Sequence, residues 1–186
     1  FIANAADLTI ASGATLTMTA NSNLQISRDW KNSGIFNPGT GTVTFNGSTA
    51  NQIQTINAGI KTLETYYNLT SNNSNGAKGI SVADNFELTV INDLSLLSGD
   101  LRLTGEAQLI QNGVAANPGG GSGKLLKDQQ GTKSSFRYNY WSAPVSRDNV
   151  SYSVGDVLKD GTDVTSFPFN PSSIAFGTGA TFADGV

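Results

Sequence analysis

The chain has 186 residues, a net charge of −3 at pH 7, only 13% charged residues, and neither cysteine nor histidine. The two missing residue types exclude disulfides, Cys–His and Ser–His–Asp nucleophile systems, and metal sites built on thiolate or imidazole ligands. The mild net charge lacks the concentrated basic face of nucleic-acid-binding domains. No apolar run approaches the roughly 20 residues of a membrane-spanning helix.

Short β-strands are predicted through much of segment 1–110, because apolar and polar residues alternate there in recurring bursts. Ser-Gly, Asn-Gly and Pro-Gly pairs between the bursts mark turns. Helical periodicity is weak, and short helical turns are expected only near residues 61–67 and 153–159. The clearest bursts are Leu8/Ile10, Leu24/Ile26, Val43/Phe45, Phe86/Leu88/Val90 and Leu101/Leu103.

A near-repeat indicates the architecture. The segment Asn23–Ser27 is echoed by Asn85–Thr89, and each copy runs on to a Ser-Gly pair. The separation of the two copies suits about three coils of a β-solenoid at ~20 residues per coil. The sequence therefore predicts an all-β, right-handed parallel β-helix with aliphatic columns inside and Thr, Asn and Ser outside. An antiparallel β-sandwich, which has the higher base rate, is the alternative.

Three regions are predicted along the chain. Residues 1–113 form the solenoid, and residues 114–123 form a Gly-rich linker or loop. Residues 124–186 form a partial second β-domain or a cap, with denser aromatic residues and with prolines that oppose regular structure. Because the chain begins at Phe1 and not at a methionine, we expect it to be a processed form or part of a longer protein.

One set of carboxylates is a candidate catalytic site. Asp84, Asp93 and Asp100 would line one face of the solenoid, as carboxylates do in β-helical polysaccharide lyases and hydrolases, and Arg102 is the local candidate base. Hydrolysis needs two carboxylates at roughly 5–10 Å. The competing interpretation is that these residues are scattered solubilising charges and turn residues.

A second acidic cluster, Asp156, Asp160 and Asp163, offers oxygen ligands for calcium. It lacks the alternating D-x-D-x-D-G spacing and the bidentate glutamate of known calcium loops. A solvated loop is therefore the preferred interpretation, with calcium as the alternative and no other cofactor expected.

Aromatic residues supply the remaining candidates. Tyr138, Tyr140 and Trp141 would form a platform for stacking sugars, or Trp141 would fill the core of the second domain with the tyrosines beside it. Trp30 is expected to be a capping aromatic residue. No catalytic, metal or cofactor residue is assigned.

Three segments, Gly39–Ser48, Tyr66–Thr70 and Tyr138–Val145, resemble large bacterial cell-surface proteins exported by the type IX secretion system. In those proteins a "DW.N.G.F..G.GTV.FNGS" block, here Asp29–Ser48, precedes a "YNL...NS.G" block, here Tyr67–Gly76. The resemblance implies export across the outer membrane, β-solenoid or β-sandwich stalks, and a C-terminal sorting domain that these residues do not include. The family contains adhesins, and also enzymes whose catalytic modules lie elsewhere in the chain.

We therefore expect a non-enzymatic, stalk-like or adhesin-like segment of a secreted or surface-displayed bacterial protein. The expected partners are the secretion machinery during export, and surface glycans or other cell-surface proteins afterwards. The alternative is a carbohydrate-active β-helix or a sugar-binding accessory module.

Overall fold

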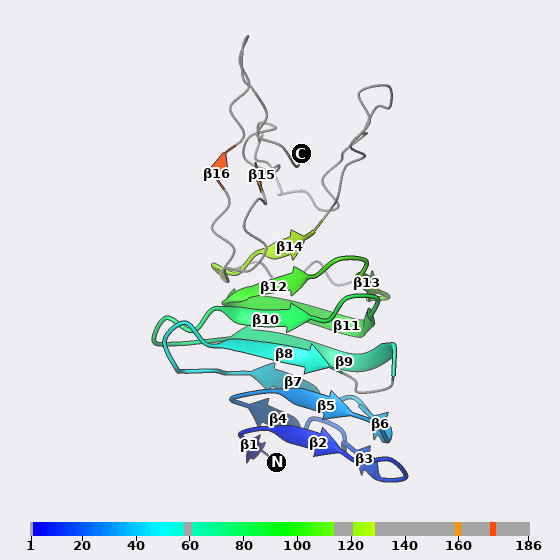
Figure 1. Ribbon diagram of the computed structural model, residues 1–186. Coiled ribbons are helices and arrows are strands. Elements are labelled where there is room, and N and C mark those ends of the chain that lie inside the picture. Colours follow the sequence, from blue (N-terminus) through cyan, green and yellow to red (C-terminus); the bar gives the residue numbers. More distant parts are fainter. Residues whose placement is uncertain (1, 58–60, 114–120, 129–158, 161–171, 174–186) are drawn as a thin grey trace, which may run out of the picture. The chain divides into compact units, whose positions relative to one another are not determined.

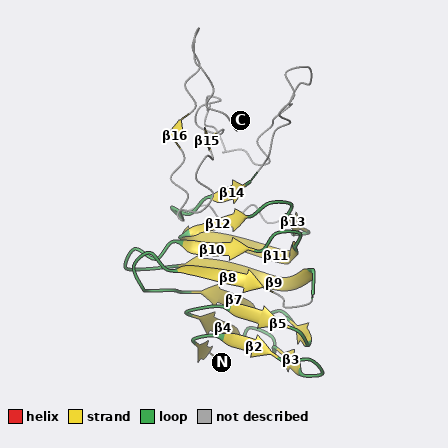
Figure 2. Cartoon of the chain, viewed as in Figure 1, coloured by secondary structure: helices red, strands yellow, loops and turns green. Residues whose placement is uncertain are grey.

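The computed structural model describes residues 2–57, 61–113, 121–128, 159–160 and 172–173. The chain divides into two compact units, 1–128 and 129–186. Every regular element among the described residues is a β-strand (Figure 2). In the second unit these are β15 (Lys159–Asp160) and β16 (Ser172–Ser173), which pair antiparallel. The first unit carries the main features of the fold.

The first unit is a parallel β-solenoid of about five turns, which confirms the predicted fold class (Figure 1). Successive turns pair in parallel, so each sheet runs the length of the stack. The first sheet contains, in spatial order, β1 (Ile2–Ala5), β4 (Asn23–Ile26), β7 (Thr42–Phe45), β9 (Leu63–Asn72), β11 (Glu87–Ser98) and β13 (Gln108–Gln111). The second contains β2 (Leu8–Ile10), β5 (Trp30–Asn32), β8 (Ile53–Asn57), β10 (Gly79–Val82), β12 (Asp100–Leu103) and β14 (Leu125–Lys127).

A third face begins as a separate two-stranded sheet, β3 (Thr15–Thr17) and β6 (Ile35–Asn37). In later turns the long strands β9 and β11 take its place. Their second halves continue the first sheet, because β7 pairs with residues 68–71 of β9. Their first halves pair with each other, and β13 pairs with residues 87–90 of β11. A register shift between Val90 and Asp93 marks the corner that β11 passes through.

The core consists of apolar columns that follow the strand register. In the first sheet one column is Leu24, Val43, Leu69 and Leu94, and all four side chains are buried. In the second sheet Trp30, Ile56, Val82 and Leu103 stack in the same way. Full burial of one such aliphatic side chain contributes about 1.5–3 kcal/mol. Because alternate residues of a strand point inward, the period of two in the sequence predicted these columns correctly.

The echo between residues 23–27 and 85–89 predicted the wrong register. Asn23 stacks on Thr42, then Asn68, then Asp93, so the position three turns after Asn23 is Asp93 and not Asn85. The two echoing segments lie on different faces, since residues 23–26 form β4 of the first sheet and residues 87–89 belong to the first half of β11, which continues the third face. Single turns differ in length because their corner loops differ, and the step from Thr42 to Asn68 is longer than the step from Asn23 to Thr42. A fixed spacing therefore cannot identify the stacked residues.

The structure differs from the sequence-based predictions at three further places. The helical turn expected near residues 61–67 is strand, because Glu64 and Tyr66 point inward while Leu63 is exposed, the alternation of a β-strand. The pairing of β14 with β12 extends the stack to residue 127, beyond the boundary expected at residue 113. Trp30 is not a capping residue: it is fully buried, because its position in β5 places it in an interior column.

Candidate functional site

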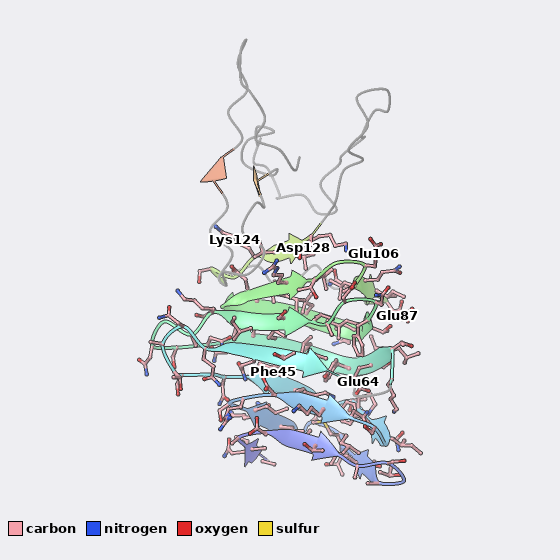
Figure 3. The ribbon with its side chains drawn as sticks, viewed as in Figure 1. Phe45, Glu64, Glu87, Glu106, Lys124 and Asp128 are labelled. Carbon is pink, nitrogen blue, oxygen red and sulfur yellow. The ribbon has the colours of Figure 1, made fainter. Side chains whose placement is uncertain are left out.

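The most unusual interior group is the carboxylate of Glu64 on β9, which is 4% exposed (Figure 3). Its Oε2 atom accepts hydrogen bonds from the indole Nε1 of Trp30 at 2.9 Å and from the side-chain amide of Asn32 at 2.6 Å. The next two residues of its column are Leu88 and Leu109. A buried carboxylate is costly unless such donors stabilise it. Glu64 is therefore a structural clamp between adjacent turns, and sequence patterning missed it because strands were assigned from apolar residues.

Aromatic rings surround this clamp. The ring centroid of Trp30 lies 4.7 Å from that of Phe36 and 5.2 Å from that of Tyr66, both in edge-to-face geometry. The Tyr66 hydroxyl is buried and has no hydrogen-bond partner among the described residues. Burial, and then the charge of Glu64, raise the pKa of Tyr66 well above its usual value near 10. The phenol thus stays neutral and acts as part of the core.

A second buried polar cluster forms where the third turn is lengthened. Gln54, fully buried on β8, accepts a hydrogen bond from the Gly47 amide at 2.9 Å, and its Oε1 lies 2.8 Å from the side-chain amide of Asn73. Its Nε2 donates to the carbonyls of Ile26 and Arg28 at 2.7 and 2.9 Å. The bonds to Gly47 and Arg28 satisfy backbone groups that lie outside the strands, while the Ile26 carbonyl also accepts the Asn46 N–H. The cluster is structural, and each of these polar contacts is internal.

Aspartates at the corners join one turn to the next. In each case a carboxylate Oδ1 accepts the backbone N–H of a residue one turn later, a group that the strand ladders leave unpaired. These bonds connect Asp7 to Asp29 (3.2 Å), Asp29 to Thr55 (2.8 Å), Asp84 to Glu106 (2.7 Å) and Asp100 to Lys124 (2.9 Å). Corner aspartates therefore act as inter-turn staples, which explains several acidic residues without a ligand.

The predicted carboxylate site does not assemble. Asp100 lies beside Gly79 at the start of the second-sheet strands, while Asp84 follows their far end, so roughly 16 Å separates their positions along the strand. Asp93 belongs to the first sheet and accepts a hydrogen bond from Ser95 at 2.6 Å. Arg102 forms a two-bond ion pair with Asp128, at 2.9 and 3.1 Å. The acids are dispersed, because turn chemistry and not a shared groove fixes their positions.

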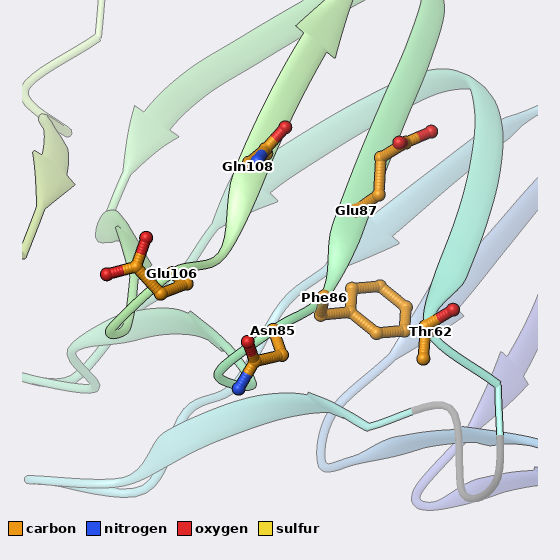
Figure 4. A pocket seen from close by; sticks show the side chains of 6 residues that line it. All are labelled: Thr62, Asn85, Phe86, Glu87, Glu106 and Gln108. Atoms are coloured by element: carbon orange, nitrogen blue, oxygen red, sulfur yellow. The ribbon is translucent and has the colours of Figure 1, made fainter.

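A shallow hollow of about 260 Å³ lies at the corner where β11 and β13 begin (Figure 4). Its two carboxylates, Glu87 and Glu106, stand on opposite sides (Figure 4). Among the described residues no group of three acidic side chains is placed to hold a metal ion. The hollow follows from the stacking of two similar turns, and it is lined by Thr62, Asn85, Phe86, Glu87, Glu106 and Gln108.

The other predicted candidates lie outside the described residues. Tyr138, Tyr140, Trp141, Asp156 and Asp163 are among them. Asp160 lies in β15, but its side chain is not described. The calcium alternative and the aromatic platform therefore stay predictions.

The ionisation of Asp100 should make the stability of the chain depend on pH. Partial burial raises the pKa of its carboxyl group, and the backbone N–H of Lys124 and the charges of Lys124 and Lys78 oppose that rise. A carboxyl group with a raised folded-state pKa binds its proton more tightly in the folded chain. Its contribution to stability is therefore greatest below the unfolded-state pKa of about 3.9 and is lost as the pH rises through the folded-state pKa.

We expect Asp100→Asn to be more stable than the wild-type chain at pH 7, by less than about 1 kcal/mol because solvent screens this half-buried site. The asparagine Oδ1 can still accept the Lys124 N–H. The difference should vanish at pH 3, where Asp100 is neutral as well. Urea unfolding at both pH values measures it, and a variant less stable than wild type at pH 7 would show that the charge itself stabilises this corner.

Comparison with protein-family models, with curated proteins and with solved structures returns no match. The described part of the chain contains no helix long and apolar enough to cross a membrane.

Proposed function

We propose that the chain is a non-enzymatic stalk or adhesin-like segment of a secreted or surface-displayed bacterial protein. The observation that carries this proposal is the unbroken parallel pairing of both long sheets through about five turns. Parallel strands of adjacent turns are joined by backbone hydrogen bonds that run along the stack. Such a stack is a stiff spacer whose length grows by one strand spacing per turn.

The outer surface of the first sheet fits this role. Side chains of neighbouring turns bond to one another along the axis, from Asn92 to Asn68 at 2.8 Å and from Asn68 to Thr42 at 3.2 Å. Thr44, which is itself buried, likewise donates to Asn23 at 3.0 Å. These ladders leave a polar surface that repeats from turn to turn, which suits weak multivalent contacts with glycans or other cell-surface proteins.

The resemblance to type IX secretion cargo supports an extracellular or cell-surface location, with the secretion machinery as partner during export. Described residues of its Asp29–Ser48 block have structural roles here. Asp29 is a corner staple, and Trp30 and Phe45 are core residues. A Cβ atom at Gly34 would lie 2.3 Å from the carbonyl oxygen of Ala14. The residues of the matching block therefore form one type of solenoid turn. This role is consistent with a stalk and requires no ligand.

Rigidity is the testable property of a stalk. The chain has no cysteine, so Thr9→Cys and Thr104→Cys introduce the only two sites for spin labels. Thr104 directly follows the last paired residue of β12, so extending the register of the second sheet by one residue puts these positions four strand spacings apart, or about 19 Å between backbones. We expect double electron–electron resonance spectroscopy to show one narrow distance distribution. A broad or multiple distribution would contradict a rigid spacer.

To test for enzymatic activity, the unsubstituted protein should be incubated with neutral and acidic polysaccharides. Release of new reducing ends or of unsaturated sugars would identify a carbohydrate-active module and overturn the proposal. Retention on a polysaccharide column without cleavage would assign the adhesin role.

A further inference from the structure

Among the described residues, the second and third turns pair on two faces, whereas the turns on either side of this junction pair on three. The first and second turns pair on all three faces, through β1–β4, β2–β5 and β3–β6. The third and fourth turns also pair on all three, through β7–β9, β8–β10 and β9–β11. Between turns two and three, the described residues pair through β4–β7 and through two residues of β5–β8. No pairing of described residues joins β6 to β9.

Hydrogen bonds that involve side chains connect the third turn to the second at this junction. Glu64 accepts the two hydrogen bonds from Trp30 and Asn32. Gln54 donates to two carbonyls of the second turn, and the Thr55 N–H donates to Asp29 at 2.8 Å. A charge-assisted hydrogen bond is stronger than a neutral one, and both Glu64 and Asp29 form such bonds here. Glu64 accepts two of them and is buried, so it is the strongest single side-chain connection of this junction.

The exposure of two apolar side chains on the third face agrees with the incomplete pairing of the described strands there. Ile35 on β6 and Leu63 on β9 are large apolar residues that are 54% and 52% exposed. They lie on the two strands, β6 and β9, whose described residues do not pair. Their apolar surface contributes little to holding the two turns together, since it remains in contact with water.

We infer that this junction is a built-in opening point, at which residues 2–41, the first two turns, separate as one unit while the later turns stay folded. The Glu64 carboxylate holds the junction on the face where the described residues of β6 and β9 do not pair. Opening would free the edges of β7 and β8, which could then pair with another strand. The inference concerns the solenoid itself and holds whichever surface role the protein has.

Native-state hydrogen exchange of the full chain, followed by mass spectrometry of its peptides, tests this inference. We expect amides of β1–β6 to become exchangeable together, through one opening, at denaturant concentrations that leave β10–β12 protected. Fraying from the end would instead release β1–β3 before β4–β6. That stepwise order, or simultaneous exchange of the whole solenoid, would overturn the inference.

Variants identify the group that holds the junction. Glu64→Ala leaves two buried donors without an acceptor, so exchange in β1–β6 should rise about 100-fold with little change in β10–β12. Glu64→Gln keeps an acceptor oxygen and should stay within about tenfold of wild type. Glu87→Gln is the matched control on an exterior position of the neighbouring strand, with no expected effect. Equal acceleration in all turns by Glu64→Ala would show a general core role instead, and the wild-type exchange order decides the question if that variant fails to fold.

Discussion

Substituting alanine for Gly79 is expected to destabilise the solenoid by about 3 kcal/mol or more. Gly79 begins β10 with a φ of +116°, a backbone conformation that residues with a Cβ atom rarely adopt. A Cβ atom there would lie 2.1 Å from the backbone oxygen of Asp100 and 2.4 Å from its nitrogen. Both contacts are backbone atoms of the paired strand β12, so relief requires the two strands to separate.

Gly76→Ala is the matched control for this substitution. Gly76 also has a positive φ, +76°, but no atom lies within 4 Å of an added Cβ atom. Its cost should be about 1 kcal/mol, the cost of the backbone conformation alone. Urea unfolding followed by far-ultraviolet circular dichroism compares the two variants. If the two variants lose similar amounts of unfolding free energy, the close approach of β10 and β12 is not what makes alanine unfavourable at position 79.

Trp30→Ala is expected to cost about 4 kcal/mol of unfolding free energy. The side chain is fully buried, packs edge-to-face against Phe36 and Tyr66, and donates to the carboxylate of Glu64. Truncation leaves a large cavity and removes one of the two donors that stabilise a buried charge. Thermal and urea unfolding should both detect the loss.

Two companion variants separate these causes. Trp30→Phe keeps most of the packing and removes the indole donor, so it should fall between wild type and Trp30→Ala. Ile2→Ala truncates an apolar side chain that is 62% exposed and should change stability by no more than about 0.5 kcal/mol. If Trp30→Phe proves as stable as wild type, the hydrogen bond to Glu64 contributes nothing measurable.

The individual strands could be predicted because they rest on local alternation. In segments such as Leu24/Ile26 and Val43/Phe45, every second residue is apolar, and each of these side chains is buried in the structure. Asn, Ser and Gly between the segments predicted frequent corners. The same local signals failed at residues 61–67, where Glu64 occupies an interior position that apolar periodicity assigns to an aliphatic residue.

The sequence by itself determined the all-β class and most of the core, since a period of two and frequent turn residues permit little except short strands around an apolar interior. Only the tertiary structure decided which residues meet across turns. Single turns differ in length, so the contacts of Glu64 with Trp30 and of Asp29 with Thr55 depend on the register that the loops impose. The same register separates three carboxylates that lie close in sequence, Asp84, Asp93 and Asp100. A different strand or corner fixes the position of each one, and no local pattern encodes the distances between them.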